Sequence, residues 1–302
     1  MTEPHRFGVV ALSGPPNAGK STLLNRIVGE KVSITSRRAQ TTRHRILGIK
    51  TLPRAQLVLV DTPGLNRDRP KRLNRATHRT ALRSLADVDL ILFMIDIRGW
   101  TPELERLFAQ VAQQGAATPI VLAINKIDRL SDRRRLLPLI KRSAEIHPFA
   151  EIMPLSALKM KAGEVDEFLA VIIKHLPPGP PGFPADQRSD RSQRFLASEL
   201  VREQTCKLLG NELPHASAVE VTRFEYDGDL LRVVAVIWVE RASQKPIVIG
   251  QGGRQLKAIG ERARKQMERM FGAQVYLDLW VKVRKNWSDN AAMLRAFGYL
   301  ED

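Results

Sequence analysis

The chain has 302 residues, of which 43 % are hydrophobic and 26 % charged, a composition typical of a globular protein with about two domains. No uncharged apolar run approaches the ~18 residues of a membrane-spanning helix, and the first residues lack the charge order expected of an export signal. The single cysteine, Cys206, cannot form an intrachain disulfide and is expected to be a buried thiol in a reducing compartment. Exported, membrane-spanning and zinc-finger classes are therefore excluded at this stage.

The charge balance favours a polyanionic partner. Lys and Arg number 48 against 32 Asp and Glu, a net charge of +16, which suits nucleic acid or an anionic membrane surface. Two basic runs lie in the first half of the chain, one over Lys31–Arg54 and one over Arg67–Arg83. A single run of this kind is usually a solvated face, but two runs together favour a surface that binds a polyanion.

Up to about Leu176, short apolar segments alternate with helical patterns. This alternation predicts an α/β domain with a mostly parallel six-stranded sheet covered by helices on both faces. The second and third segments lie too close in sequence for a crossover helix, so a hairpin with one antiparallel edge is expected between them. The expected strands are Gly8–Ser13, Ile46–Lys50, Leu57–Val60, Leu90–Ile95, Ile120–Ile124 and Ile152–Leu155, and the expected helices include Lys20–Ile27 and Leu104–Gln113.

A proline-rich stretch separates this domain from a second pattern. Five prolines between Pro177 and Pro184, followed by polar residues, predict a stiff, extended linker. Beyond it, the order helix, two strands, helix, strand predicts a small α+β domain. These elements are expected at Phe195–Leu209, Ala218–Phe224, Leu230–Val239, Gly253–Phe271 and Val275–Val283. The expected boundaries are 1–176 for the first domain, 177–194 for the linker, 195–286 for the second domain and 287–302 for a C-terminal tail.

A phosphate-binding loop follows the first expected strand. The residues GPPNAGKS match the pattern GxxxxGK[ST] and open a helix, which is the context that this motif requires. Backbone N–H groups of such a loop converge on phosphate oxygens, and the helix N-terminus adds a favourable dipole. Lys20 is expected to reach the β- and γ-phosphates, and Ser21 to bind Mg²⁺. The residues expected to bind the nucleotide here are Gly14, Pro15, Asn17, Ala18, Gly19, Lys20, Ser21 and Thr22.

The motif NKID at residues 125–128 favours guanine over adenine. Asp128 can accept hydrogen bonds from guanine N1–H and its 2-amino group, whereas adenine would leave this carboxylate unpaired. Asn125 and Lys126 are expected to tie the base-binding loop to the phosphate loop. Ser156 and Ala157, after the next strand, are expected to contact the base.

Two further segments are expected to respond to the γ-phosphate. In DTPG, at residues 61–64, Asp61 is expected to hold Mg²⁺ through water, and the Gly64 N–H to face the γ-phosphate and release it after hydrolysis. Upstream, Thr42 is the expected second metal ligand, with Thr41 as the alternative.

The expected catalytic set lacks a residue that many GTPases have. Leu65 follows Gly64 at the position where many GTPases carry a glutamine that orients water, so unaided hydrolysis is expected to be slow. The side-chain oxygen of Asn17 could instead bring a monovalent cation such as K⁺ to the phosphates; its alternative role is to stabilise the loop. The expected catalytic residues are Lys20, Thr42, Gly64 and Asn17.

The second domain carries a glycine turn, GQGG at residues 250–253, before a helix with one apolar face. A loop without side chains lets a sugar–phosphate strand pass close to the backbone, which is how a KH domain grips about four unpaired nucleotides. A KH-like fold without RNA affinity is the alternative. The residues expected to bind RNA are Lys245, Gly250, Gln251, Gly252, Gly253, Arg254 and Lys257.

Together, the segments GPPNAGKS, SITSRRAQTTRHRI, DTPGL, NKID, DRSQRFLASE, VIGQGG and LWVKV resemble the Era family of bacterial GTPases in content and order. The resemblance covers essentially the whole chain, with departures at Leu158, where Lys or Glu is common, and at Leu256, where Ile is usual. It implies a P-loop GTPase domain followed by a type II KH domain, with GTP or GDP and Mg²⁺ bound. It also implies binding to the 3′ end of small-subunit ribosomal RNA and to the small ribosomal subunit, under control of the nucleotide state. The implied location is the cytoplasm, with weak peripheral association with the inner face of the plasma membrane, and a monomer is expected.

Two other classes share part of this pattern. A tRNA-modification GTPase also carries motifs like TTR and DTPGL, but the KH-like domain at the C-terminus disfavours it. A membrane-attached signalling GTPase would use the basic runs on lipid, although no amphipathic anchor or lipidation motif is visible.

Overall fold

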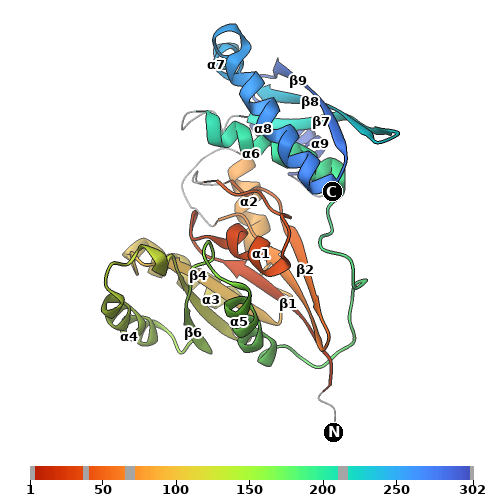
Figure 1. The fold of residues 1–302 in the computed structure, drawn as a ribbon. Coiled ribbons are helices and arrows are strands. Elements are labelled where there is room, and N and C mark those ends of the chain that lie inside the picture. Colours follow the sequence, from red (N-terminus) through yellow and green to blue (C-terminus); the bar gives the residue numbers. More distant parts are fainter. Residues whose placement is uncertain (1–3, 37–40, 65–71, 210–216, 300–302) are drawn as a thin grey trace. The chain divides into compact units, whose positions relative to one another are not determined.

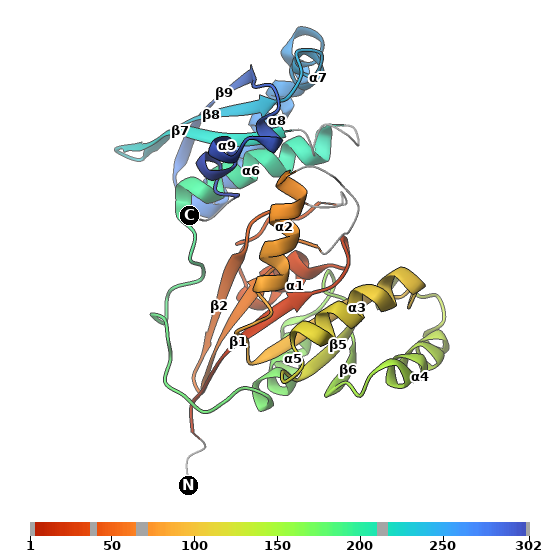
Figure 2. The ribbon, with the colours of Figure 1, turned by 180° about the vertical axis from the view of Figure 1, so that it is seen from behind.

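The computed structural model describes residues 4–36, 41–64, 72–209 and 217–299. The chain divides into two compact units. The first contains residues 1–33, 42–67 and 78–190, and the second contains 34–41, 68–77 and 191–302. Figures 1 and 2 show the elements of each unit from opposite sides. Within the described ranges, no helix is both long and apolar enough to cross a membrane.

The first unit is built on a six-stranded sheet with the strand order β2-β3-β1-β4-β5-β6. Strand β2 runs antiparallel to β3, and every other neighbouring pair is parallel. The mostly parallel sheet with one antiparallel edge is thereby confirmed. The strands are β1 (Arg6–Ser13), β2 (Ile46–Leu52), β3 (Ala55–Asp61), β4 (Leu90–Asp96), β5 (Ile120–Asn125) and β6 (Glu151–Pro154).

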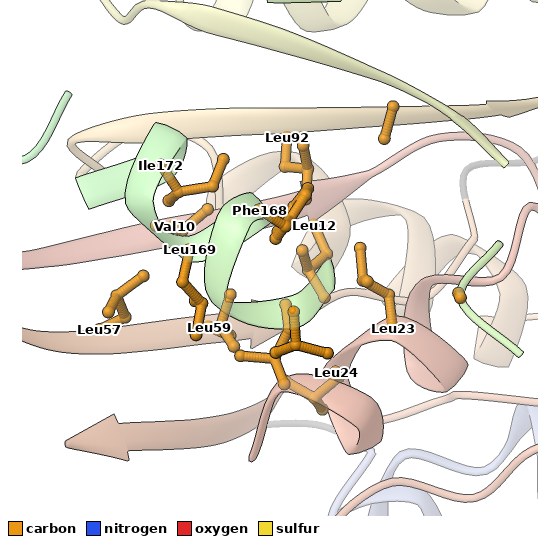
Figure 3. Packing of buried hydrophobic residues seen from close by; sticks show 14 of the residues in the cluster. Val10, Leu12, Leu23, Leu24, Leu57, Leu59, Leu92, Phe168, Leu169 and Ile172 are labelled. Atoms are coloured by element: carbon orange, nitrogen blue, oxygen red, sulfur yellow. The ribbon is translucent and has the colours of Figure 1, made fainter. Parts of the chain in front are cut away.

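Helices cover both faces of this sheet because side chains of successive strand residues point to opposite faces. On one face, Phe168 and Leu169 pack with Val10 and Leu12 of β1 in a single apolar cluster, which Figure 3 shows from close by. On the other face, Ala11 of β1 joins a second cluster. The helices of the first face are α1 (Lys20–Val28) and α5 (Ala162–Lys174), and those of the second are α3 (Pro102–Gln114), α4 (Leu136–Ile146) and the end of α2 (Arg72–Arg83). Short 3₁₀ turns, η1 (Ile127–Arg129) and η2 (Arg133–Arg135), lie between β5 and α4.

The proline-rich stretch is extended, as its composition predicts, but it lies against the first unit. The side-chain amide of Gln56, which is fully buried, donates to the Phe183 carbonyl at 2.8 Å and accepts from the Gly182 and Phe183 N–H groups. Further along, the Ile49 N–H donates to the Arg188 carbonyl. An edge strand such as β2 has unpaired backbone groups, and this stretch supplies partners for some of them.

The second unit has a three-stranded sheet in the order β7-β8-β9, with β7 antiparallel and β9 parallel to β8. Helices α6 and α8 cover one face, and the apolar positions Ile259, Ala263 and Met267 of α8 are buried there. A short helix α7, which includes Pro246, was not expected from the sequence. The elements are α6 (Gln193–Leu208), β7 (Ser217–Asp227), β8 (Leu230–Val239), α7 (Gln244–Ile249), η4 (Gln251–Gly253), α8 (Arg254–Phe271) and β9 (Gln274–Val283).

The segment after residue 286, expected to be a C-terminal tail, is folded in the part that the structure describes. Residues up to 299 form η5 (Trp287–Asp289) and α9 (Ala291–Ala296). Trp287 is fully buried, and Leu294 and Tyr299 join it in an apolar cluster with Ala218 of β7. Polar and apolar residues alternate irregularly here, so no period in the sequence indicates which of them are buried.

We expect Trp287→Ala to destabilise the protein by about 3–5 kcal/mol, because a fully buried indole leaves a large cavity. The matched control is Trp280→Ala on β9, where the side chain is 55 % exposed and the loss should stay below about 1 kcal/mol. Chemical denaturation of the full chain measures both. Equal losses for the two variants would mean that the C-terminal segment does not pack as described.

Candidate nucleotide and RNA sites

The phosphate loop joins the end of β1 to the start of α1. Helix α1 begins at Lys20, directly after Gly19, whose φ of 111° is in the region that favours glycine. The Lys20 ammonium is buried and donates to the carbonyl oxygens of Gly14 at 2.9 Å and Pro15 at 3.0 Å. Burial lowers the pKa of Lys20 to about 8, although the nearby Asp61 carboxylate opposes this shift. The Lys20 ammonium could therefore exchange these two carbonyl oxygens for phosphate oxygens when a nucleotide binds.

Hydroxyl groups converge on Asp61 at the end of β3. Its Oδ2 accepts from Ser21 Oγ at 2.6 Å and from Ser33 Oγ at 2.8 Å, and Thr42 Oγ1 lies 3.5 Å away. The Ser21 and Thr42 hydroxyl oxygens are 2.8 Å apart. Burial raises the pKa of Asp61, while the hydrogen bonds from these hydroxyls and the charge of Lys20 counteract that increase.

The donor set fits Mg²⁺. The second oxygen of Asp61, Oδ1, is buried and has no hydrogen-bond partner in the structure, so it is available for a water ligand of a metal. A hard cation prefers such oxygen donors. Among the residues that the structure describes, no group of three or more His, Cys, Asp or Glu could hold a different metal. Ser21, Thr42 and Asp61 are the residues that would hold the ion.

The structure distinguishes the two candidate threonines and adds a serine. Thr42 lies beside Ser21 in the first unit. Thr41 belongs to the second unit, where its carbonyl accepts a hydrogen bond from Arg202. Ser33 was missed as a site residue in the sequence, although it is the first residue of the segment SITSRRAQTTRHRI. Asn25 positions it, because its side-chain oxygen accepts from the Ser33 N–H at 2.9 Å.

The segment DTPG at residues 61–64, which is expected to sense the γ-phosphate, lies beside the phosphate loop. A Cβ atom on Gly64 would come within 3.0 Å of the Pro16 Cα, so only glycine fits here without a shift of the backbone. Leu65, the residue that replaces the usual glutamine, lies outside the described residues. Asn17 is exposed in the phosphate loop and has a φ of 63°.

Asn125 joins the base-binding loop to the phosphate loop. Its side-chain N–H donates to the Ala18 carbonyl at 2.7 Å, and its side-chain oxygen accepts from the Ala157 N–H at 2.9 Å. Both ends of this amide are therefore fixed at the carboxyl end of β5. The contact with Ala18 also requires Gly19, because any Cβ atom there would collide with the Asn125 amide.

Lys126 has a different partner from the one its motif suggested. Its ammonium donates to Asp96 Oδ2 at 3.0 Å rather than to the phosphate loop. Burial opposes ionisation of Asp96, but hydrogen bonds from Arg98 and Lys126 outweigh it and lower the pKa of Asp96 to about 2. The sequence reasoning missed Asp96. Its position directly after the apolar segment Leu90–Ile95 was the signal that could have found it, since neighbouring parallel strands end at the same edge.

The expected base contacts lie together. Ser156 Oγ donates to Asp128 Oδ1 at 2.6 Å, which leaves Asp128 Oδ2 for a ligand. Asp128 is half-buried, while the side chain of Leu158 is 65 % exposed. The geometry thus provides one oriented carboxylate at the carboxyl end of the sheet, where ligands bind in open α/β folds.

The glycine turn of the second unit connects α7 to α8. Gly250 has a φ of 73°, and a Cβ atom there would lie 2.6 Å from the Cβ of Gln255. Gly252 and Gly253 also have positive φ, but no heavy atom lies within 4 Å of where their Cβ atoms would be. Gly250 is thus required by packing, whereas Gly252 and Gly253 leave open space beside the backbone. Basic residues flank this space: the side chains of Lys245, Arg254 and Lys257 are all exposed.

Comparisons with known proteins match both units. A family model described as "50S ribosome-binding GTPase" matches residues 9–126, and one described as "KH domain" matches residues 212–288. The protein called GTPase Era in Xanthomonas axonopodis pv. citri is 52 % identical over 299 residues, which cover 99 % of each chain. GTPase Era of Xylella fastidiosa is 53 % identical over 301 residues, with 99 % of each chain covered.

Two solved structures share the fold with a TM-score of 0.94 and 41 % identity, covering 98 % of this chain and 100 % of theirs. One is an Aquifex aeolicus Era variant bound to GDP·AlF₄⁻. The other is Era in complex with MgGDPNP and nucleotides 1506–1542 of 16S ribosomal RNA. The type II KH arrangement after a P-loop GTPase domain is therefore confirmed.

The low pKa of Lys20 predicts that nucleotide binding takes up a proton at alkaline pH. The free site loses its ammonium proton above pH 8, and bound phosphates raise the pKa again by favouring the charged form. Lys20 should take up about 0.1 proton at pH 7 and about half a proton at pH 8. Titration calorimetry with GDP at pH 8 in buffers of different ionisation enthalpy measures this number, because at that pH the diphosphate is ionised while the guanine N1–H still keeps its proton. Absence of uptake at pH 8 would contradict the prediction.

Proposed function

The chain belongs to the Era family of GTPases, and on this premise we propose that it is a GTP-switched, RNA-binding factor for assembly of the small ribosomal subunit. It binds GTP and Mg²⁺, hydrolyses GTP to GDP and phosphate, and holds the 3′ end of small-subunit ribosomal RNA in a nucleotide-dependent manner. The proposed division of labour is a GTPase domain over 1–176, a linker over 177–194 and an RNA-binding domain over 195–286, followed by a C-terminal segment over 287–302.

The nucleotide chemistry rests on residues of the first unit. Lys20 binds the β- and γ-phosphates, and the Ser21 and Thr42 hydroxyls are metal ligands beside Asp61. The metal ion supplies charge neutralisation for the phosphates when it is bound. Asp128 selects guanine by accepting from its N1–H and 2-amino groups. The convergence of Ser21 and Thr42 on Asp61 supports this assignment.

One observation carries the RNA part of the proposal: the backbone at Gly252 and Gly253 is bare on its open side and lies between exposed basic residues. A sugar–phosphate strand can approach such a backbone closely, because no Cβ atom keeps it away. Lys245, Arg254 and Lys257 supply charge for the phosphates, and the solved complex of a relative with ribosomal RNA supports this class of ligand.

The glycine turn predicts a selective loss of RNA binding. In the double variant Gly252→Asp/Gly253→Asp, two carboxylates occupy the space for phosphates, so we expect the affinity for ribosomal 3′-end RNA to fall at least about tenfold. GDP affinity should stay within about twofold, since the nucleotide residues are untouched. Filter binding of the labelled RNA, with GTP or GDP present, measures the loss.

A matched control separates this effect from charge and backbone strain. Gly228 and Gly272 also have positive φ and open space at the Cβ position, but they lie outside the glycine turn. The variant Gly228→Asp/Gly272→Asp therefore adds the same charge and the same kind of strain, and it should bind RNA normally. Parallel samples with tRNA and with anionic vesicles distinguish the other two classes. Preference of the unaltered protein for tRNA or for vesicles would overturn the proposed function.

We also propose that Asn17 ligates K⁺ beside the phosphates, which would supply charge near a site where Leu65 offers no polar atom. The exposed position of Asn17 in the phosphate loop, with its positive φ, supports the assignment. We expect K⁺ to accelerate hydrolysis relative to Na⁺ in the unaltered protein, and Asn17→Ala to bring that ratio close to one. Steady-state phosphate release at constant ionic strength measures it, and K⁺ stimulation that survives in the variant rules the assignment out.

A further inference from the structure

The loop after α1 returns a buried serine to the candidate metal site. Helix α1 ends at Val28, and Gly29 closes it with a φ of 88°. Further along this loop, Ser33 is 1 % exposed, and its hydroxyl donates to Asp61 Oδ2 at 2.8 Å. Both residues belong to the first unit, yet Ser33 is neither a proposed metal ligand nor a phosphate-binding residue.

Asn25 of α1 holds the backbone of Ser33 on both sides. The side-chain oxygen of Asn25 accepts from the N–H groups of Val32 and Ser33, each at 2.9 Å. The side-chain N–H of Asn25 donates to the Ser33 carbonyl at 2.7 Å. Because the N–H and the carbonyl of Ser33 are both restrained, Asn25 fixes the point from which the hydroxyl reaches Asp61.

The two oxygens of Asp61 have different surroundings. Oδ2 accepts from Ser21 at 2.6 Å and from Ser33 at 2.8 Å, while Thr42 Oγ1 lies farther away at 3.5 Å. Oδ1 is buried and has no hydrogen-bond partner among the described residues. The torsion between a carboxylate and its Cβ has broad minima, so the group turns easily unless its neighbours hold it. Two close donors on Oδ2 therefore hold the plane of the carboxylate and leave Oδ1 for another ligand.

Ser33 differs from Ser21 in what a bound metal ion requires of it. The Ser21 hydroxyl oxygen is a proposed metal ligand, so the ion and Asp61 both determine its position. Ser33 contacts Asp61 from outside the proposed ligands, and its hydrogen bonds with Asn25 involve none of them. Residues that orient the carboxylates of a metal site in this way commonly change metal affinity by about tenfold or more.

We propose that Ser33, held by Asn25, is a positioning residue for Asp61 and keeps Oδ1 available to a water ligand of Mg²⁺. The inference rests on the proposed function, because it assigns Asp61 to a metal site that serves a guanine nucleotide. A carboxylate that is held by the fold needs no further ordering when the ion binds, and this preorganisation increases the affinity for the ion.

The test compares Ser33→Ala with a matched control, Ser143→Ala. The first substitution removes only the hydroxyl that reaches Asp61. Ser143 of α4 is also fully buried in the first unit, and its hydroxyl makes two hydrogen bonds, with Trp100 Nε1 at 2.9 Å and with the Leu139 carbonyl at 2.8 Å. The control therefore also loses the hydrogen bonds of a buried serine, but it leaves the contacts of Asp61 intact.

Binding of the analogue GDPNP over a range of Mg²⁺ concentrations gives a readout that does not depend on turnover. We expect the Mg²⁺ concentration for half-maximal tightening of GDPNP binding to rise about tenfold in Ser33→Ala and to stay within about twofold in Ser143→Ala. In excess EDTA, GDPNP affinity should stay within about twofold in both variants, because the proposed effect of Ser33 acts only through the ion. A distorted phosphate loop would instead weaken GDPNP binding both with and without Mg²⁺.

A double-mutant cycle tests the part assigned to Asn25. Alone, Asn25→Ala should raise the required Mg²⁺ concentration by about threefold or more, because the Ser33 hydroxyl loses its anchor. In the Ser33→Ala background, the same substitution should add less than about a twofold rise, since no hydroxyl remains to be positioned. Should Asn25→Ala not fold, the comparison of Ser33→Ala with Ser143→Ala still decides whether Ser33 positions Asp61.

The outcomes separate the inference from the proposed function. If GDPNP binding to the unaltered protein does not respond to Mg²⁺, the proposed function fails at its metal site. If the unaltered protein responds and Ser33→Ala needs no more Mg²⁺ than it does, or if Ser143→Ala shows the same rise as Ser33→Ala, Ser33 does not position Asp61. Additive effects of Asn25→Ala and Ser33→Ala would overturn the role of Asn25 as the anchor.

Discussion

A carboxylate buried at the end of a parallel strand is the constraint on which the first unit depends. Asp61 is fully buried, so its charge must be balanced by hydroxyl donors, by Lys20 and by a cation. This requirement explains why Ser21, Ser33 and Thr42 converge from three separate parts of the chain. It also leaves a place for a metal ion, because one oxygen of Asp61 has no hydrogen-bond partner among the described residues.

Both candidate sites depend on glycines at positions where a Cβ atom would block a close contact. At Gly19 the absence of a Cβ lets the Asn125 amide reach the phosphate loop, which joins base recognition to phosphate binding. At Gly250 it lets the turn lie against Gln255, whose side chain donates to the Leu208 carbonyl at the end of α6. The glycine turn is therefore anchored on its inner side and bare on its outer side, which suits a loop that has to meet an incoming backbone without moving.

Short sequence patterns were enough to predict most of the helices and strands. Short apolar segments predicted each strand of the six-stranded sheet, and the spacing of Ile259, Ala263 and Met267 predicted the buried face of α8. The motifs also indicated which residues belong to the sites. They could not indicate side-chain partners, because Lys126 reaches Asp96 and Asp61 reaches Ser33 through folding that brings distant segments together. The packing of Trp287 escaped prediction partly for the same reason, since Leu73 and Ala218 of its apolar cluster lie far away in sequence, although Leu294 and Tyr299 lie near it.

The second unit includes two stretches from the first half of the chain, 34–41 and 68–77, and this limits how the protein can be divided. The stretch 68–77 contributes Leu73 to the cluster around Trp287, and the Arg72 N–H donates to Asp289 at 2.7 Å. A truncated fragment that ended at Asp190 would keep every nucleotide motif, yet it would lack Arg202, which donates to the Thr41 carbonyl, and the apolar cluster that contains Leu73. Such a fragment would carry stretches of the second unit without the core on which they pack, so a cut at Asp190 would leave neither unit whole.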